Sequence, residues 1–172
     1  MSQVICIGEL LIDFVAKHHS AAIESAENFT KKAGGAPANV ACAVRRLGQK
    51  ALFAGAVGND PMGNFVVHTL EAEDIDVSYM QRTKEFTTLA FVALSDEGER
   101  DFYFSRGADA GLAYDPKLAA QFKGSIVHFG SATAFLEGTL NETYHRYLNH
   151  SLATAKLVSF DPNYRSDLWK VN

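Results

Sequence analysis

Four nearly continuous apolar runs, well separated along the chain, constrain its fold more than any other feature of the sequence. They cover residues 4–8, 51–58, 125–130 and 157–161. Uninterrupted apolar strands are typical of a parallel sheet that is covered on both faces, whereas a half-exposed strand alternates apolar and polar residues. Amphipathic stretches separate the runs, and this strand and helix order predicts an α/β fold with right-handed crossovers.

The amphipathic stretches carry local signals for helix ends. After Gly34-Gly35, a helix is expected with Pro37 in its first turn, Leu47 on its apolar face together with Val40 and Val44, and Gly48 as its C-terminal cap. Three further helices are expected to start at Asp60-Pro61, to start at Asp115-Pro116, and to cover residues 140–156.

One segment departs from this alternation. Residues 87–94 and 100–104 are β-prone and flank a polar turn cluster at residues 95–99. The pattern predicts an antiparallel hairpin inserted into the α/β chain. Such an insertion is a natural lid, although an ordinary edge hairpin fits the pattern equally well.

Length and composition exclude several classes of protein. The 172 residues fit one domain, and a net charge of −4 gives no support for binding nucleic acid or an anionic membrane surface. The apolar N-terminal stretch contains Glu9 and Asp13 and lacks a basic region, so neither a signal peptide nor a membrane span is expected. The two cysteines stand in apolar segments, which indicates buried thiols in a reducing, cytoplasmic setting. The six histidines form no metal-binding pattern, and no metal site is expected from them.

The strongest local candidate for a ligand site is the glycine pair Gly34-Gly35. Paired glycines allow a close backbone approach to a bound molecule, and the helix start that follows offers unpaired N–H donors. A tight turn is the alternative interpretation. Asn39 lies in the first turn of this helix, where its side chain faces either the ligand or water. Asp13 follows the first strand, near the carboxyl end at which α/β folds bind ligands, and a carboxylate there accepts hydrogen bonds from adjacent hydroxyls. A solvated surface carboxylate is the alternative interpretation of Asp13.

Two arginines are further candidates. Arg165 closes the polar run 161–165 after the last apolar strand, and Arg106 follows the hairpin. A guanidinium at either place is suited to a phosphate or a carboxylate. A surface ion pair is the alternative for both.

Taken together, these motifs resemble the ribokinase-like (phosphofructokinase-B type) carbohydrate kinases, and within them most closely the fructokinases. The resemblance rests on residues 8–13, 34–48, 57–63, 96–104 and 161–165, which occur in the family's order and extend over essentially the whole chain. It implies a ribokinase-like sheet with an inserted antiparallel β lid, formed by segments near 14–33 and 86–106.

The resemblance also implies an activity and roles for individual residues. In this family a sugar hydroxyl attacks the γ-phosphate of ATP, with Mg²⁺ and in some members a monovalent cation as further requirements. Carried over, Asp13 and Asn39 bind the sugar hydroxyls, and Gly34-Gly35 provide the close backbone approach. Arg106 reaches in from the lid, and Arg165 holds the phosphorylated end or the approaching phosphate. Pairing of lids into a homodimer is a family-based expectation, in which Phe102 and Phe104 line the lid underside or the contact.

The chain also departs from the family, whose members are considerably longer. The metal segment, the nucleotide pocket and the loop with the general base, an aspartate, are absent before Asn172. We therefore expect a truncated, sugar-binding half with no catalytic residue of its own, little phosphoryl transfer and an exposed sheet edge. The expected substrate is fructose, giving fructose 6-phosphate. The alternatives are kinases for 2-keto-3-deoxygluconate, a nucleoside or an aminoimidazole riboside, and a non-catalytic sugar-binding module.

Overall fold

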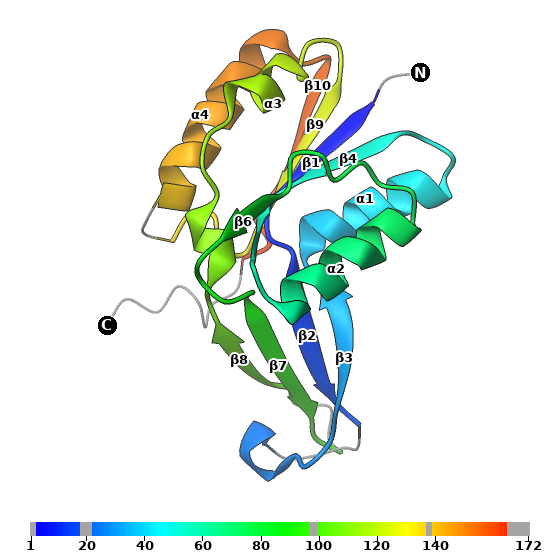
Figure 1. Cartoon of the computed structure of the whole chain (residues 1–172), viewed down its shortest axis with the longest axis vertical. Helices are drawn as coiled ribbons and strands as arrows, with labels where there is room; N and C mark the ends of the chain where they lie inside the picture. The colour runs from blue at the N-terminus through cyan, green and yellow to red at the C-terminus, as the bar shows by residue number, and fades with distance from the viewer. Residues whose placement is uncertain (1–2, 18–21, 97–99, 137–138, 165–172) are drawn as a thin grey trace.

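The fold is built on a parallel sheet with helices on both faces, as the apolar runs predicted. The computed structural model describes residues 3–17, 22–96, 100–136 and 139–164. The sheet has the strand order β10-β9-β1-β4, with all pairs parallel (Figure 1). Its strands are β1 (Val4–Ile7), β4 (Ala51–Ala54), β9 (Ile126–Gly130) and β10 (Leu157–Asp161).

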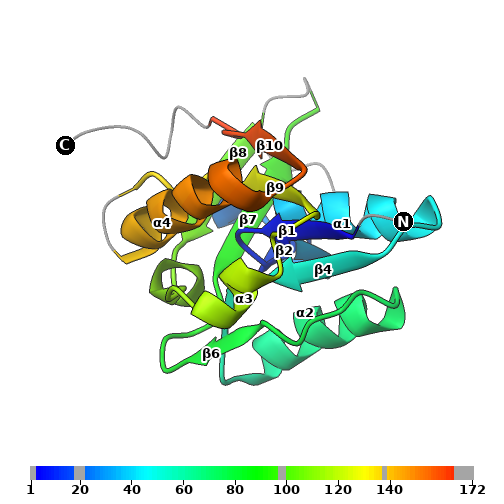
Figure 2. The same cartoon turned by 90° about the horizontal axis from the view of Figure 1, so that it is seen from above.

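Burial on both faces explains why β1 contains no polar residue. Ile5 and Ile7 point to one side and Cys6 to the other, and all three are fully buried. The first side packs against α3 (Pro116–Ala120) and α4 (Thr139–Thr154), and the second against α1 (Ala36–Arg46) and α2 (Pro61–Ala72). Viewed from above, α4 and α1 lie on opposite sides of the sheet (Figure 2).

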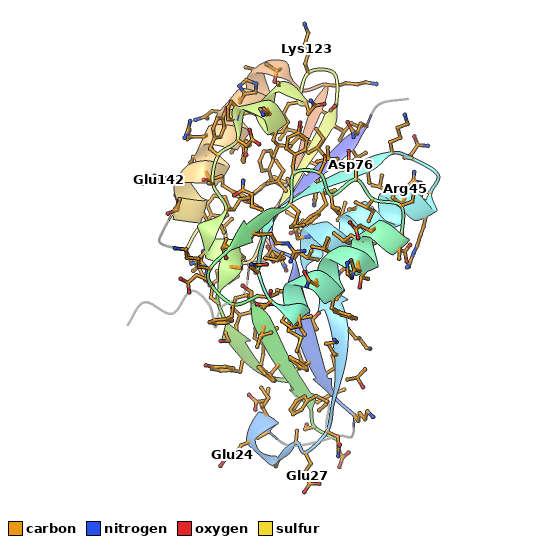
Figure 3. The ribbon with its side chains drawn as sticks, viewed as in Figure 1. Glu24, Glu27, Arg45, Asp76, Lys123 and Glu142 are labelled. Carbon is orange, nitrogen blue, oxygen red and sulfur yellow. The ribbon has the colours of Figure 1, made fainter. Side chains whose placement is uncertain are left out.

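A second four-stranded sheet extends away from the parallel one (Figure 1). Its order is β3-β2-β7-β8, in which two antiparallel hairpins are joined through the parallel pair β2 and β7. The strands are β2 (Leu11–Ala16), β3 (Phe29–Gly34), β7 (Leu89–Leu94) and β8 (Arg100–Ser105). The expected hairpin is confirmed as β7 and β8. A single helical turn, η1 (Ile23–Ser25), connects β2 to β3 near the far end of this sheet, where Glu24 and Glu27 are labelled in Figure 3.

The prediction of one strand over residues 51–58 is wrong. The chain divides at Gly55 into β4 and β5 (Ala56–Gly58), and β5 pairs with β6 (Gln81–Thr83) in a separate two-stranded sheet. A side chain at Gly55 would collide with the Phe53 ring and the backbone of Gly8. Only a glycine therefore allows the chain to leave the parallel sheet at this point.

Helix α1 begins and ends at the residues that the sequence indicated. Gly35 is its N-cap, and Gly48 has φ +77° directly after the C-cap. The N–H of Gly48 donates to the Arg45 carbonyl at 2.8 Å and that of Gln49 to the Val44 carbonyl at 3.1 Å, which is a Schellman motif. The expectation that Leu47 packs inward is wrong, since its side chain is 79% exposed at the C-cap, after the last turn that contacts the sheet.

The remaining described element is η2 (Ala108–Gly111), a short 3₁₀ turn that follows β8. Among the described residues, no helix combines the length and apolar character that crossing a bilayer requires.

Candidate functional site

Asp13 lies in the second sheet rather than at the end of β1. Strand β1 ends at Ile7, and Asp13 is the third residue of β2, paired in register with Lys32 on β3 and Ala90 on β7. The apolar residues after Glu9 begin the new strand β2, so Asp13 belongs to β2 and not to the loop that follows β1. Burial raises the pKa of Asp13, and the positive charge of Lys32 opposes that effect.

The face that carries Asp13 continues across the sheet as a row of small and aromatic side chains. Ala90 pairs with Asp13 on one side and with Phe104 on the other, and Phe102 is the next residue on that face of β8. The rings of Phe102 and Phe104 are stacked with centroids 6.1 Å apart, and Phe102 is 38% exposed. The strand register thus puts one carboxylate and two aromatic rings on the same surface of this sheet.

Gly34 and Gly35 bring the two sheets together at the start of α1. A side chain on Gly34 would have its Cβ only 2.6 Å from the Cγ of Asp13, and one on Gly35 would collide with the Glu9 backbone. Gly35 has φ +113°, a conformation that L side chains rarely adopt. As the N-cap of α1 it offers no side-chain hydrogen bond, so the first amides of the helix lack a side-chain partner from the cap. These two glycines therefore place the helix N-terminus next to the Asp13 carboxylate.

Asn39 is exposed on α1, and its backbone N–H donates to the Gly35 carbonyl at 3.0 Å. Its side chain and Gly34 both line an open hollow of about 580 Å³ between α1, α2 and the end of β3, which Asp13 does not line. Arg46 and Glu73 also line this hollow, and they form an ion pair in which Arg46 Nη2 lies 2.5 Å from Glu73 Oε1. Gly34 therefore connects the two candidates: the Asp13 carboxylate lies against it, and it lines the same hollow as Asn39.

Arg106 follows β8 and turns toward the parallel sheet. Its Nε donates to Asp109 Oδ2 at 3.4 Å and its Nη2 donates to the Thr133 carbonyl at 3.2 Å. These contacts hold Arg106 against the loop after β9, with 22% of its side chain exposed. Arg165 lies outside the described residues, so the structure says nothing about it.

A buried polar cluster at the carboxyl ends of β1 and β9 was not predicted from the sequence. Its acids are Glu9 and Asp109, each 2% exposed, and its hydroxyl groups come from residues that are also buried. The hydroxyl-bearing members are Thr88, Ser131, Thr133 and Tyr144. The one sequence signal for it was an acid within an apolar segment: Glu9 stands between the first strand and the Leu10-Leu11-Ile12 run.

Burial dominates the electrostatics of this cluster. It raises the pKa of Glu9 to about 7, helped by the nearby charge of Asp109 and opposed by hydrogen bonding to Ser131 and the Ala132 backbone. Glu9 Oε2 has no hydrogen-bond partner among the described residues. The Tyr144 hydroxyl donates to the Ile7 carbonyl at 2.7 Å, and burial raises the pKa of Tyr144 well above its ordinary value. Near neutral pH, Glu9 is therefore a carboxyl group that changes charge inside the protein.

Within the part of the chain that the structure describes, no group of three or more His, Cys, Asp or Glu side chains could hold a metal ion. Among the described residues there is therefore no site that would hold Mg²⁺ through protein side chains alone.

The site combines a carboxylate, a glycine-rich helix start and an attached second sheet. Comparison with known protein families shows to which family a chain with these features belongs. The model of the pfkB family carbohydrate kinases matches residues 1–171. The chain belongs to the pfkB family of carbohydrate kinases. This confirms the resemblance to ribokinase-like kinases inferred from the sequence motifs.

Individual members of the pfkB family are similar over nearly the whole chain. "Probable fructokinase-2" of Arabidopsis thaliana is 35% identical over 170 residues, covering 96% of this chain and 51% of the relative. The fructokinase structure from Halothermothrix orenii superposes with a TM-score of 0.86 at 27% identity, over 98% of this chain and 60% of that one. A sugar kinase from Pyrococcus horikoshii, solved in complex with ATP, gives a TM-score of 0.86 at 30% identity, over 96% of this chain and 55% of that one. The chain spans about half the length of the curated relatives that it matches.

Proposed function

We propose that this chain provides the sugar-binding part of an ATP-dependent sugar kinase and that its sugar is fructose, phosphorylated to fructose 6-phosphate. The observation that carries the proposal is the contact between Asp13 and Gly34 at the uncapped start of α1. A carboxylate accepts hydrogen bonds from two neighbouring hydroxyls, while helix amides donate to a sugar oxygen. Both kinds of partner thus lie at one point, as recognition of a polyhydroxylated molecule requires.

Residues around this point are assigned supporting roles in the proposal. Asn39 extends the polar surface from the first turn of α1, and Arg106 approaches from the base of the second sheet. Arg165 remains assigned to the phosphorylated end of the sugar. The second sheet acts as the lid that excludes water from the sugar.

Fructose is favoured by the names of the similar proteins, among them the fructokinase from Halothermothrix orenii and "Probable fructokinase-2". ATP as phosphate donor is supported by the ATP complex of the Pyrococcus horikoshii sugar kinase. In this proposal the nucleotide, Mg²⁺ and any monovalent cation are held by the remainder of a kinase of the relatives' length. The kinase is cytoplasmic, and it pairs through the sheet face that carries Phe102 and Phe104 into a homodimer.

Calorimetric titration with fructose tests the proposal directly. We expect saturable binding that Asp13→Asn weakens at least about tenfold, because a hydrogen bond to a charged group contributes about 1.5–3 kcal/mol. Asp76→Asn is the matched control, since Asp76 lies away from the second sheet (Figure 3) and its carboxylate accepts a hydrogen bond from the Ser78 backbone N–H, which an asparagine oxygen also accepts. Equal fructose affinity in both variants would contradict the proposed site.

The same titrations distinguish the alternative substrates and roles. Tighter binding of 2-keto-3-deoxygluconate, a nucleoside or aminoimidazole riboside would keep the kinase assignment and replace fructose. Binding of fructose without any ADP formation from ATP is expected of this chain alone. ADP formation by the unsubstituted 172-residue chain at the rate of a complete kinase would contradict the proposal that the nucleotide is held by residues outside this chain.

A further inference from the structure

Three side-chain hydrogen bonds at the loops that follow β8 and β9 converge on Asp109. Its Oδ2 accepts from the Thr133 hydroxyl at 2.7 Å and from Arg106 Nε at 3.4 Å, while its Oδ1 accepts from the Thr88 hydroxyl. Asp109 is 2% exposed, and Thr88 and Thr133 are fully buried. Three donors therefore surround one carboxylate that water does not reach.

Ser131 holds the loop after β9 that carries Thr133. Its Oγ accepts the backbone N–H groups of Thr133 at 3.0 Å and Ala134 at 2.9 Å. Thr133 Oγ1 lies 3.1 Å from Ser131 Oγ and donates its own proton to Asp109 Oδ2. The Thr133 hydroxyl that holds Asp109 is therefore fixed by a loop that has hydrogen bonds of its own.

Arg106 is bound to both ends of this arrangement. Its Nε meets the Asp109 carboxylate, and its Nη2 meets the carbonyl of Thr133, the same residue whose hydroxyl holds Asp109. Two points of attachment fix the plane of a guanidinium, whereas one leaves it free to rotate. Contacts from the segment after β8 and from the loop after β9 thus together fix one orientation of the Arg106 guanidinium.

We propose that Asp109 is a positioning residue for the sugar site: together with Thr133 it fixes the guanidinium of Arg106 in the orientation that contacts the bound sugar. This inference rests on the proposed function, because it assumes that Arg106 belongs to the sugar site. Asp109 itself does not touch the sugar. It acts by removing the rotational freedom that Arg106 would otherwise lose on binding.

The test uses Asp109→Asn together with a matched pair at one position. Thr133→Val removes the hydroxyl that holds Asp109, and Thr133→Ser retains it. For each variant, the exchange of the Arg106 Nε–Hε proton with water is measured by ¹H–¹⁵N NMR, with Arg106→Lys identifying the signal. Fructose affinity is measured on the same samples by calorimetry.

We expect the Arg106 Nε–Hε proton to exchange at least about tenfold faster in Asp109→Asn and Thr133→Val, and at nearly the parent rate in Thr133→Ser. Fructose affinity is expected to fall in the first two variants to the level of Arg106→Lys. The double variant Asp109→Asn with Arg106→Lys is expected to bind no more weakly than Arg106→Lys alone, since both changes remove the same interaction.

Several outcomes would overturn the proposal. One is an Arg106→Lys variant that loses affinity while Asp109→Asn and Thr133→Val keep parental affinity and exchange. Another is unchanged affinity in Arg106→Lys when Asp13→Asn binds weakly, which would remove Arg106 from the site and leave the proposed function intact. Unchanged affinity in Asp13→Asn as well would contradict the proposed function itself. If Asp109→Asn does not fold, the Thr133→Val and Thr133→Ser pair decides the question alone.

Discussion

The carboxylate of Asp13 occupies the space that a side chain on Gly34 would need. A Cβ at Gly34 would lie 2.6 Å from Asp13 Cγ and 3.1 Å from its Oδ1. The two residues lie diagonally across neighbouring antiparallel strands, since Gly34 opposes Leu11 and Asp13 opposes Lys32. The absence of a side chain at Gly34 thus lets Asp13 lie against the backbone at the start of α1, and this makes the glycine a determinant of the site.

Gly34→Ala is expected to weaken fructose binding with little loss of stability. The new methyl group displaces the end of a flexible side chain, so the fold adapts while the Asp13 carboxylate moves out of place. We expect an affinity loss of at least about tenfold by calorimetry, because a misplaced charged hydrogen bond costs about 1.5–3 kcal/mol. Gly111→Ala is the control, at an exposed glycine where the new Cβ would lie 3.2 Å from the Thr83 methyl group and far from Asp13. Parental affinity in Gly34→Ala would show that Asp13 is not held by this contact.

The neighbouring substitution Gly35→Ala is expected to act on stability instead. Its φ of +113° is strained for alanine, and the new Cβ would meet the rigid backbone of Glu9 rather than a side chain. A residue forced into such a conformation costs about 1–3 kcal/mol, and the steric overlap adds to that. Urea unfolding is expected to show a lower midpoint than in Gly34→Ala. A urea midpoint equal to that of the unsubstituted protein would mean that the backbone around Gly35 adjusts to the new Cβ without a loss of folding free energy.

The sequence predicted the parallel sheet because its strands depend on a local property. An uninterrupted apolar run indicates a strand buried on both faces whatever its neighbours are. Helix ends were predictable for the same reason, since Gly48 and Pro61 determine backbone geometry where they stand. Strand β3, with Thr30, Lys31 and Lys32 in its middle, shows no such signal, because its β structure comes from pairing with β2.

The candidate site was predictable only in part, for a related physical reason. The glycine pair Gly34-Gly35 indicates, from the sequence alone, a backbone that leaves no room for side chains or has an unusual φ. The burial of Asp109 depends instead on Thr88 and Thr133, which the fold brings to it from 21 and 24 residues away. The environment of a buried acid arises from such distant contacts, and no local pattern around Asp109 records them.

The buried carboxyl group of Glu9 is expected to make stability depend on pH near neutrality. Its pKa lies at about 7 in the folded protein and at 4.5 ordinarily. As pH rises from 4.5 to 7, the unfolded chain releases this proton before the folded one does, so the free energy of unfolding falls. At about 1.4 kcal/mol per pKa unit, the loss is about 3 kcal/mol and is complete above pH 7.

Glu9→Gln removes this titration while keeping the shape of the side chain. We expect the free energy of unfolding of the variant, relative to the parent, to improve by about 3 kcal/mol between pH 4 and pH 8. Urea unfolding at both pH values measures it. Glu142→Gln, an exposed substitution on α4 (Figure 3), is expected to leave the parental pH dependence unchanged. A parental pH dependence in Glu9→Gln would show that the pKa of Glu9 is the same in the folded and the unfolded chain.

Strand β10 has an unpaired edge in the part of the chain that the structure describes, since β9 is its one partner there. Leu157 and Phe160 on this strand are 56% and 47% exposed. Exposed apolar side chains beside free backbone N–H and C=O groups promote pairing with another chain. We therefore expect the chain to self-associate beyond the proposed homodimer at micromolar concentration and higher, which light scattering detects as a mass above twice the 18.8 kDa of one chain.

A charge on this edge should oppose the association. Leu157→Glu puts a carboxylate on the strand, and pairing would then bury that charge or bring two copies of it together. The matched control is Leu47→Glu, which adds the same charge at a leucine that is 79% exposed but lies at the end of α1. We expect Leu157→Glu to lower the mean mass toward that of the homodimer proposed above and Leu47→Glu to leave it unchanged. If both variants lower the mass equally, net charge rather than the β10 edge controls the association, and the edge has no special role.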